Sequence, residues 1–408
     1  MPLTADVVVV GGGPAGAAAA IVLARDGRDV VLVDRAAFPR DKCCGDGLTA
    51  GALRRLESLG LRPAAVESWQ VVDDVVIASP SGRTTTFPLP RGAGTYAAVA
   101  RRFDLDGALL NVARDAGVKV HDGHAVTGAR AADDRVVVDV AGGVGEIHAR
   151  YAVAADGMWS PMRKFLGCQP DGYLGDWHAF RQYFQGVGDE AASRLWVWFE
   201  PDLLPGYAWS FPLPDGGANV GFGVLRRAGE PTKSMKALWP ELLARPHIAA
   251  VIGARATAES AHKAWPIPAS VERAVLHAGG GRVLFVGDAA RASDPMSGEG
   301  IGQALETGTL AAEAIARGGW SRPDLAAATY TQAVRSGLVL DNRLAGWLSR
   351  RLSTRTGAVL SIRIAAASPW TRRNFARWLF EDYPRAMVAT PWRWHRGMFT
   401  APGAFRRQ

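Results

Sequence analysis

The chain has 408 residues, of which 48% are hydrophobic and 21% are charged. This composition is typical of two or three packed globular units and excludes a disordered protein. Three cysteines are too few for a disulfide framework, no Cys and His residues have the spacing of a metal site, and no apolar run is long enough to cross a membrane. Glycines interrupt the first apolar run, so we expect no signal peptide and a location in the reducing cytoplasm.

The net charge of +8 is concentrated near the C-terminus. Residues 340–408 hold 13 Arg, no Lys and three acids, with five Trp interleaved. One interpretation is a helical layer whose Arg side chains face water and whose Trp side chains pack on the body of the protein. A second is peripheral contact with an anionic membrane, where indole rings lie at the interface. Nucleic acid would need phosphate contacts and base stacking along the same segment, and we do not expect it as a partner.

The N-terminal residues predict a strand, a turn, a helix and a second strand. The run DVVVV at 6–10 is a buried strand, and the Ala-rich helix after it ends at Gly27. Between them, Gly11, Gly13 and Gly16 form the pattern G-x-G-x-x-G. Glycines at this spacing allow a tight turn and let the backbone approach a pyrophosphate, which the helix N-terminus binds through free N–H groups. The context therefore predicts a dinucleotide-binding site.

An acidic residue follows at the end of the second strand. Asp34 lies 18 residues after Gly16. An acid near this spacing binds the ribose hydroxyls of a dinucleotide. Arg35 comes directly after it, and we expect both residues at the nucleotide. The pattern by itself does not distinguish NAD from FAD.

The rest of the chain alternates between helical and strand patterns. Helices are predicted at 49–59, with Thr49 as N-cap and Gly60 as the stop, at 103–117 and at 298–316, and strands within 71–90, 118–123, 135–140, 151–157, 178–225 and 281–290. We expect residues 324–408 to be mostly helical.

Two segments resemble the FAD motifs of flavoprotein monooxygenases and their relatives. AADGMWSPMRK contains an Asp-Gly pair at Asp156, and VGDAARASDPMSGEGIGQALETG resembles the second FAD motif, with Asp288 in its Gly-Asp pair. The resemblance implies FAD as the cofactor and places Asp288 at the ribityl chain or the pyrophosphate. It also implies that the turn at Gly298 and Gly300 directs the helix beginning at Ile301 toward the flavin pyrimidine ring, where the helix dipole stabilises an anionic reduced ring.

Three stretches together resemble the geranylgeranyl reductase family, and most closely its actinobacterial menaquinone side-chain reductase branch. They are FPRDKCCGDGLTAGAL, LPGYAWSFPLPDGGANVGFGV and GEGIGQALETG. This family reduces isolated C=C bonds of prenyl chains with reduced FAD. Its Cys-Gly pair falls on Cys44 and Gly45, and its Tyr-x-Trp-x-Phe-Pro motif begins at Tyr207 and Trp209. The resemblance also places an Arg near the cofactor at a helix start, which is Arg101 or its neighbour Arg102.

The two adjacent cysteines lie in a loop that would face the flavin. Gly45 and Gly47 let the backbone approach a flat ring. We expect Cys44 to have a lowered pKa, because it precedes a helix and lies near Lys42. The hypothesis is that Cys44 protonates or orients the alkene while the flavin delivers hydride, although a thiolate could only orient it. The alternative is that Cys44 and Cys43 are packing residues.

Alternating aromatic residues predict that one face of a strand forms an aromatic wall. Tyr207, Trp209 and Phe211 would line an apolar tunnel for a polyprenyl chain, or else belong to an ordinary aromatic sheet core. Trp196 and Trp198 show the same alternation and the same two alternatives.

The sequence departs from the family pattern at SDPMSGEG. Asp294 and Ser297 stand where the family usually has Asn. This departure keeps a second function open, an FAD-dependent monooxygenase of an aromatic or polyketide-like metabolite. A halogenase is disfavoured because Tyr207 and Phe211 depart from the halogenase motif. A third class, a non-catalytic flavin-binding or membrane-docking protein, is disfavoured by the cysteine loop and the aromatic strand together.

The expected fold is α/β, with a Rossmann-type FAD-binding domain, a mostly antiparallel β-sheet substrate domain and a helical C-terminal region. The expected boundaries are 1–70, 97–175 and 266–323 for the FAD domain, 71–96 and 176–265 for the substrate domain, and 324–408 for the basic C-terminal region. Because no second Gly-rich nucleotide motif is present, we expect the electron donor to be transiently bound NAD(P)H or a ferredoxin-like protein.

Overall fold

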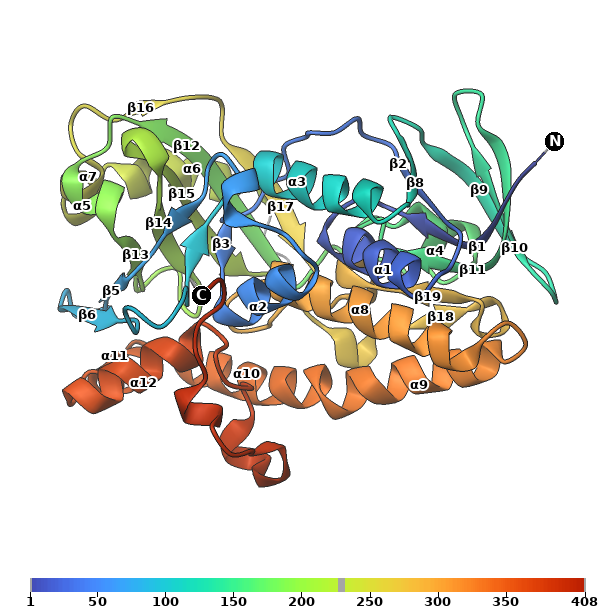
Figure 1. The fold of residues 1–408 in the computed structure, drawn as a ribbon. Helices are drawn as coiled ribbons and strands as arrows, with labels where there is room; N and C mark the ends of the chain where they lie inside the picture. The colour runs from blue at the N-terminus through green and yellow to red at the C-terminus, as the bar shows by residue number, and fades with distance from the viewer. Residues whose placement is uncertain (1, 227–231, 407–408) are drawn as a thin grey trace.

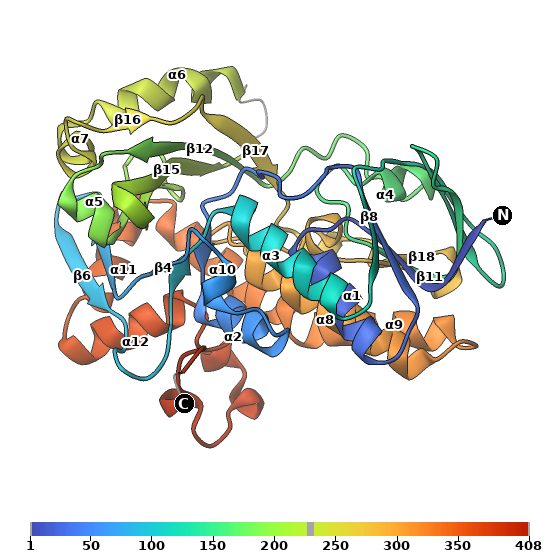
Figure 2. The same ribbon diagram turned by 45° about the horizontal axis from the view of Figure 1, so that its top comes forward.

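The computed structural model describes residues 2–226 and 232–406. Within these residues two eight-stranded sheets make up the two halves of the molecule. The helices of the C-terminal region run along one side of both halves (Figure 1), and the view in Figure 2 shows the second sheet with its own helices on its outer face. The chain is therefore a mixed α/β protein with a helical C-terminal region.

The first sheet is built around parallel strands rich in Val. Its order is β18–β19–β11–β1–β2–β8, and β10 and β9 extend it as an antiparallel flap from β11. The bounds are β1 Leu3–Val10, β2 Val30–Asp34, β8 Lys119–Asp122, β9 Val126–Ala131, β10 Val136–Val140, β11 Gly145–Ala154, β18 His277–Ala278 and β19 Val283–Phe285. Parallel strands such as β1 are buried on both faces, which explains their continuous apolar runs.

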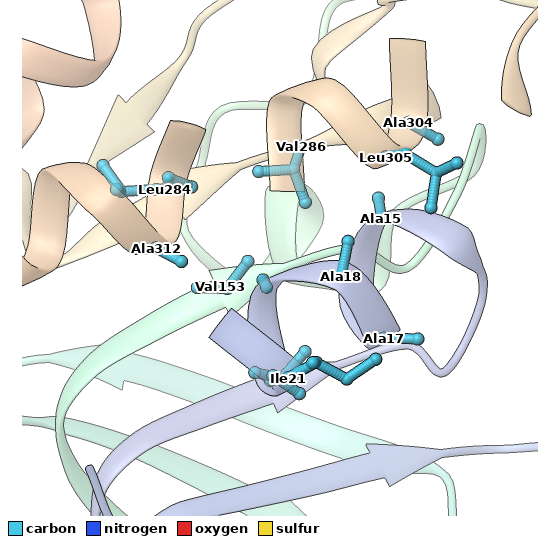
Figure 3. Close-up of a cluster of buried hydrophobic side chains, with 14 of the residues drawn as sticks. Ala15, Ala17, Ala18, Ile21, Val153, Leu284, Val286, Ala304, Leu305 and Ala312 are labelled. Carbon is cyan, nitrogen blue, oxygen red and sulfur yellow. The ribbon is translucent and has the colours of Figure 1, made fainter. Parts of the chain in front are cut away.

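Helices α1 (Pro14–Arg25) and α8 (Ile301–Gly318) pack closely against each other on this sheet (Figure 3). Alanines of α1, among them Ala15 and Ala18, meet the buried side of α8. A Cβ atom at Gly308 of α8 would lie 2.1 Å from the carbonyl oxygen of Ala15, so only glycine permits this approach. The contact places the N-termini of both helices at the same edge of the sheet, next to the site described below.

Further elements surround the first sheet. They are α2 Ala50–Ser58, α3 Arg102–Asp115, α4 Pro161–Phe165 and a small sheet of β3 Gly47–Leu48, β7 Ala98–Val99 and β4 Gln70–Val71. The predicted cap of α2 is confirmed, because the backbone N–H of Ala52 donates to Thr49 Oγ1 at 3.3 Å.

The second sheet has the order β16–β12–β15–β14–β13–β5–β6, with β17 also paired to β12. Its pairs are antiparallel except β13 with β5. The bounds are β5 Asp74–Ala78, β6 Thr84–Pro88, β12 Trp177–Gln185, β13 Leu195–Trp198, β14 Tyr207–Leu213, β15 Gly217–Leu225, β16 Thr257–Ala258 and β17 Lys263–Ile267, and the helices on its outer face are α5 Asp189–Ser193, α6 Thr232–Leu243 and α7 Pro246–Ile252.

The C-terminal region is helical only in its first part. Helices α9 Pro323–Ser336, α10 Leu338–Leu352, α11 Arg355–Ala365 and α12 Pro369–Leu379 are followed by short 3₁₀ turns within residues 380–406. The expectation of a mostly helical 324–408 is therefore confirmed for the described residues, although regular α-helix ends at Leu379. Pro384 and Pro391 interrupt helical hydrogen bonding there, and Glu381 adopts a left-handed conformation with φ 55°. Among the described residues, no helix is long and apolar enough to span a bilayer.

Candidate active site

A cavity of about 1080 Å³ lies where both sheets and the C-terminal helices meet. Its lining includes the turn before α1, the cysteine loop, strand β14 and the start of α8. Helices α10, α11 and α12 contribute further apolar residues. The cavity thus collects nearly all the motifs that the sequence singled out, and it has a polar end at α1 and an aromatic end at β14.

The polar end is formed by the N-terminus of α1. Gly11 has φ 107°, and a Cβ there would lie 2.3 Å from the carbonyl oxygen of Ala155. A Cβ at Gly16 would lie 1.8 Å from the carbonyl oxygen of Gly11. Gly13 caps the helix without a side-chain acceptor for its first N–H groups. The glycines therefore leave the positive end of the α1 dipole open to the cavity, as a pyrophosphate site requires.

Two arginines strengthen this positive end. Arg102 donates from Nε and Nη2 to the carboxylate of Asp106, each at 2.7 Å, and Arg40 donates to the same carboxylate at 2.9 Å. Burial acts to lower the pKa of Arg102, but Asp106 outweighs it and the pKa lies above its usual value. Two cations share one anion, so the group carries a net positive charge beside α1. Arg40 and Asp106 were not foreseen, because no local pattern connects a loop residue to a helix 66 positions away.

The end of β2 supplies the expected acid. Asp34 accepts hydrogen bonds from the backbone N–H groups of Gly12 at 2.7 Å and Ala36 at 2.8 Å, one on each carboxylate oxygen. Each oxygen keeps a free lone pair, which suits ribose hydroxyls. Asp34 and Arg35 both line the cavity.

Of the two arginines considered at the start of α3, only Arg102 lines the cavity. Arg101 instead donates to the carboxylate of Glu259 at 2.8 and 2.6 Å, and its guanidinium lies over the ring of Tyr183. The structure therefore places Arg101 outside the cavity and gives its neighbour the position beside α1.

The two aspartates of the FAD motifs also reach the cavity. Asp156 accepts from the hydroxyl of Ser160 at 2.7 Å and from the N–H of Met162 at 2.8 Å, which ties the start of α4 to the Asp-Gly turn. Burial raises the pKa of Asp156 to about 6. Asp288 lines the cavity from the turn after β19.

The N-terminus of α8 carries an acid that sequence reasoning missed. Gly298, Gly300 and Ile301 line the cavity as expected. However, Glu299 Oε1 accepts from the N–H of Ile301 at 3.0 Å and of Gly302 at 3.3 Å. Burial, and then the nearby carboxylate of Glu381, raise the pKa of Glu299 to about 8. The amides expected to face the flavin are therefore already bound to a carboxyl group.

Residues after α12 supply a second carboxyl group at this position. Glu381 accepts from the hydroxyl of Thr49 at 2.9 Å and from the side-chain amide of Gln303 at 2.7 Å. The buried Arg385 lies 3.6 Å from Glu381 and 3.4 Å from Asp294. The C-terminal region is thus built into the site.

The departure at SDPMSGEG has a structural role. Asp294 Oδ1 accepts from the N–H groups of Met296 at 2.8 Å and Ser297 at 2.7 Å, and its other oxygen faces Arg385. Among the described residues that line the cavity, Ser297 is present and Asp294 is not. Asp294 therefore holds the loop in shape from behind.

The cysteine loop lies between the two ends of the cavity. Cys43, Cys44 and Gly45 all line it, and a Cβ at Gly45 would lie 3.4 Å from the ring of Phe211. Burial raises the pKa of Cys44 to about 12 and that of Cys43 to about 11.

The expected lowering of the Cys44 pKa is therefore wrong. The helix after the loop begins only at Ala50, and Lys42 itself has its pKa lowered to about 8 by burial, with its ammonium group 3.5 Å from the centre of the Trp265 ring. Neither feature offsets the loss of hydration around the thiol. Cys44 keeps its proton at neutral pH, so it can donate one.

Strand β14 forms the aromatic end. Tyr207, Trp209 and Phe211 all line the cavity, with neighbouring ring centroids 6.0 and 5.9 Å apart. Tyr207 donates its hydroxyl proton to the carbonyl oxygen of Ser297. The alternation therefore does produce a wall. The remaining apolar lining comes from β5, β13 and the C-terminal helices, including Ile77, Val197, Leu348, Leu352, Ile362, Phe375, Trp378 and Leu379.

Unlike the aromatic residues of β14, Trp196 and Trp198 do not line the cavity. Both pack in the hydrophobic core on the outer face of the second sheet, with Phe180 and Phe222. Their rings stack on each other with centroids 5.6 Å apart. For these two residues the packing alternative is correct.

The residues present fit FAD at the level of chemistry. The polar end offers a helix N-terminus, two arginines and a ribose-binding acid, and the adjoining apolar space has flat aromatic walls.

Residues 4–333 match the family described as FAD binding domain. Menaquinone reductase of Mycobacterium tuberculosis H37Rv is 32% identical, over 96% of this chain and 95% of that protein. The chain belongs to the geranylgeranyl reductase family. Its members, this protein included, are FAD-dependent oxidoreductases.

Other relatives support the same family. Digeranylgeranylglycerophospholipid reductase 1 of Methanopyrus kandleri is 34% identical over 76% of this chain and 79% of its own. The crystal structure of a geranylgeranyl bacteriochlorophyll reductase-like protein from Thermoplasma acidophilum has TM-score 0.78 at 20% identity, over 96% of this chain and 99% of that one. Halogenase PltM in complex with phloroglucinol and FAD has TM-score 0.70 at 18% identity, over 95% and 84%. At these identities the solved structures show a shared fold only.

Proposed function

We propose that this geranylgeranyl reductase family member reduces isolated C=C bonds in the prenyl chain of a lipid, quinone or prenylated metabolite. The observation that carries the proposal is the single cavity that joins a dinucleotide site to a long apolar wall, with a protonated thiol between them. The names of the relatives, menaquinone reductase and digeranylgeranylglycerophospholipid reductase, support this substrate class.

The cofactor residues are assigned on the same geometry. Gly11, Gly13 and Gly16 with α1 would hold the pyrophosphate, Asp34 and its neighbour Arg35 would hold the ribose, and Asp156, Asp288 and the turn Gly298–Ile301 would border the ribityl chain and flavin. When bound, FAD supplies the hydride. Arg102 is assigned here in place of Arg101.

The protein itself has to supply a proton and hold the alkene. A neutral alkene resists hydride attack unless a proton is transferred to its other carbon. Cys44 is the proposed donor, because its thiol is protonated and lies on the cavity wall. Tyr207 and Trp209 would hold the prenyl chain across the flavin, aided by Trp378 and its apolar neighbours from the C-terminal region. The electron donor is proposed to be NAD(P)H or a ferredoxin-like protein.

The C-terminal region is proposed to contact an anionic membrane, where a lipid substrate would reside. Four of its five tryptophans are exposed, Trp347 at 45%, Trp370 at 66%, Trp392 at 72% and Trp394 at 51%. Arginines flank them, and exposed indoles with cations suit the lipid interface. In flotation with phosphatidylglycerol vesicles we expect wild type to bind and the double variant Trp370→Ala/Trp392→Ala to bind about tenfold less, with phosphatidylcholine vesicles as the control. Equal flotation of both proteins would contradict the contact.

An anaerobic turnover experiment tests the reductase proposal. Protein reduced with dithionite is mixed with a menaquinone or a geranylgeranyl lipid, and flavin reoxidation is followed with the product mass. We expect reoxidation without oxygen and a gain of two mass units per bond. Cys44→Ala should slow it by about 100-fold or more. Cys168→Ala is the matched control, because that thiol donates to the carbonyl oxygen of Leu166 away from the cavity.

The same experiment has an outcome that favours the monooxygenase. Flavin that stays reduced until air is admitted, followed by oxygen incorporation into an aromatic substrate, would replace the proposed function. Cys44 would then be a packing residue.

A further inference from the structure

A buried carboxyl group lies in the cysteine loop and belongs to no cofactor motif. Asp46 is 0% exposed and has the left-handed φ of 67°. Its Oδ2 accepts from the hydroxyl of Tyr183 at 2.6 Å and from the side-chain amide of Asn219 at 2.8 Å. Its Oδ1 has no hydrogen-bond partner within the part of the chain that the structure describes. A buried carboxylate oxygen without a partner is costly, so its retention calls for a function.

Hydrogen bonds join Asp46 to the proposed proton donor. The backbone N–H of Asp46 donates to Cys44 Sγ at 3.4 Å. Asn219 donates at 2.9 Å to the carbonyl oxygen of Cys44 as well as to the Asp46 carboxylate, and it accepts from Trp209 Nε1 at 3.1 Å. Both Cys44 and Asp46 line the cavity. The Cys44 thiol therefore contacts the backbone of Asp46, and Asn219 joins the Asp46 carboxylate to the Cys44 carbonyl oxygen and to the aromatic wall.

On its other side, Asp46 is held by a tyrosine that lies among arginines. The ring of Tyr183 lies between the guanidinium groups of Arg181, at 4.0 Å, and Arg101, at 4.4 Å. Arg181 pairs with Asp41, which also pairs with the half-exposed Lys263. The Tyr183 hydroxyl therefore holds the Asp46 carboxylate, while the two arginines contact the face of its ring, which carries no proton.

Saturating a C=C bond requires a proton at the donor for every bond reduced. One C–H bond forms with the hydride from the cofactor, which is oxidised, and the other forms with the Cys44 proton, which leaves a thiolate. That thiolate has to be reprotonated before a second bond is reduced. We propose that Asp46 returns this proton to Cys44 and takes up its own proton from water that enters the cavity, which both residues line. The inference rests on the proposed function and assigns a positioning and proton-supply role to the same site.

The acidities of the two groups agree with this direction of transfer. Burial raises the pKa of Asp46 to about 6 and that of Cys44 to about 12, so a proton moves from carboxyl to thiolate favourably. Besides Cys44, the charged or titratable groups near Asp46 include Tyr183, Arg181, Arg102, Arg101 and Cys43. We expect the rate of repeated reduction to fall as pH rises through about 6, because the protonated carboxyl is then less populated.

The first test separates the first bond reduced from the later ones. The FAD-loaded variant Asp46→Asn is given a substrate with several double bonds under anaerobic conditions. We expect the first bond to be reduced within about threefold of the wild-type rate, because Cys44 starts protonated, and later bonds to be about tenfold or more slower. The fall in rate near pH 6 should disappear in Asp46→Asn. It should move to higher pH in Tyr183→Phe, which loses the hydrogen bond that lowers the pKa of Asp46. Tyr330→Phe is the control, since it removes a buried hydroxyl that bonds to Phe285 far from the loop.

Three results would overturn the proposal. Equal slowing of first and later bonds would show that Asp46 only holds the loop. No slowing of later bonds in Asp46→Asn would exclude it as the proton source. A pH profile of Tyr183→Phe indistinguishable from that of Tyr330→Phe would show that the Asp46 carboxyl group does not cause the fall in rate.

A second test does not depend on the substrate. In FAD-loaded protein with Cys43→Ala and Cys168→Ala, Cys44 is alkylated with iodoacetamide across a pH series. Because the Asp46 carboxylate raises the pKa of Cys44, Asp46→Asn should speed alkylation near pH 9 by about tenfold. Unchanged alkylation would disprove the coupling even in a working reductase. A faster rate in a protein that reduces no prenyl substrate would leave the coupling standing and reject the proposed function.

Discussion

Two helix N-termini face the same cavity and differ in what occupies them. At α1 the cap residue Gly13 offers no acceptor, and Arg40 with Arg102 adds net positive charge. At α8 the first amides are bound by Glu299, with Glu381 close behind. Both helices have the same dipole, so the difference lies entirely in the side chains around them.

The positive charge at the α1 end is permanent, whereas the charge at the α8 end changes with pH. The α1 end attracts an anion at any pH at which proteins fold, because its charges are guanidinium groups. The α8 end holds a carboxyl group whose pKa is raised to about 8, so its charge changes in the neutral range. A flavin ring placed there would have to share or displace the Glu299 hydrogen bonds, and the following predictions test each end in turn.

The largest effect is expected from Gly16→Ala, which breaks the α1 end. The new Cβ would lie 1.8 Å from a backbone oxygen that cannot move away, so we expect loss of bound FAD and destabilisation by about 3 kcal/mol or more. Flavin absorbance of the purified protein and its thermal midpoint measure both. Gly346→Ala is the control, because its Cβ meets nothing within 4 Å, and it should be neutral or slightly stabilising. A flavin-loaded Gly16→Ala protein would contradict the predicted geometry of the turn.

Arg102→Gln is expected to rank second. It removes one of the two cations and leaves Asp106 with Arg40 alone, so we expect a loss of about 2–4 kcal/mol in unfolding free energy and FAD affinity lowered by at least about tenfold. FAD titration by fluorescence quenching provides the measurement. Arg101→Gln is the matched neighbour and should leave FAD affinity unchanged; the reverse ranking would restore Arg101 to the cofactor site.

Glu299→Gln tests the α8 end through the pH dependence of the unfolding free energy. A carboxyl group with a raised folded pKa binds more protons in the native state, so it makes stability fall as pH rises from its ordinary value of 4.5 to about 8. The variant removes this contribution, and its unfolding free energy relative to wild type should increase across that window by an amount on the order of a few kcal/mol. Denaturant unfolding of FAD-depleted protein at pH 5, 6.5 and 8 measures the difference. A difference that is constant with pH would show that Glu299 is ionised throughout.

The smallest effect is expected for Glu381→Gln. Its carboxylate is the neighbouring charge that adds to the raised pKa of Glu299. Removing it should lower the pKa of Glu299 and shift the fall in stability to lower pH by about one unit or less. The amide oxygen can still accept from Gln303, and the amide NH2 can donate to the Thr49 hydroxyl. The same unfolding series detects the shift. An unchanged profile would mean that burial alone sets the pKa of Glu299.

Local patterns predicted the parts of the site that lie within one turn of a strand end. Gly11, Gly13 and Gly16 with Asp34 follow from one strand–helix–strand unit, whose geometry is determined by neighbours in sequence. The alternation on β14 likewise determined that Tyr207 and its partners share a face. The pairing of strands decided that these β14 residues face the cavity. It also decided that Trp196 and Trp198 of β13 face the opposite side of the sheet.

Contacts between distant segments produced what the patterns did not predict. The hydroxyl of Thr49 meets the carboxylate of Glu381 across 332 residues, and Arg40 meets Asp106 across 66. The pKa of Cys44 was misjudged for the same reason, because this residue packs against the core around the first sheet and Asn219 binds its carbonyl oxygen, contacts that the loop sequence does not show.

By itself, the sequence determined the cofactor class, the family and the strand–helix–strand unit at the N-terminus, because each depends on short-range periodicity or on motifs within a few residues. Only the tertiary structure decided which arginine meets the cavity, that the residues after α12 close it, and that the thiol keeps its proton. These outcomes depend on burial and on charges brought together from different segments, and desolvation and Coulomb energies are set by distance in space rather than along the chain.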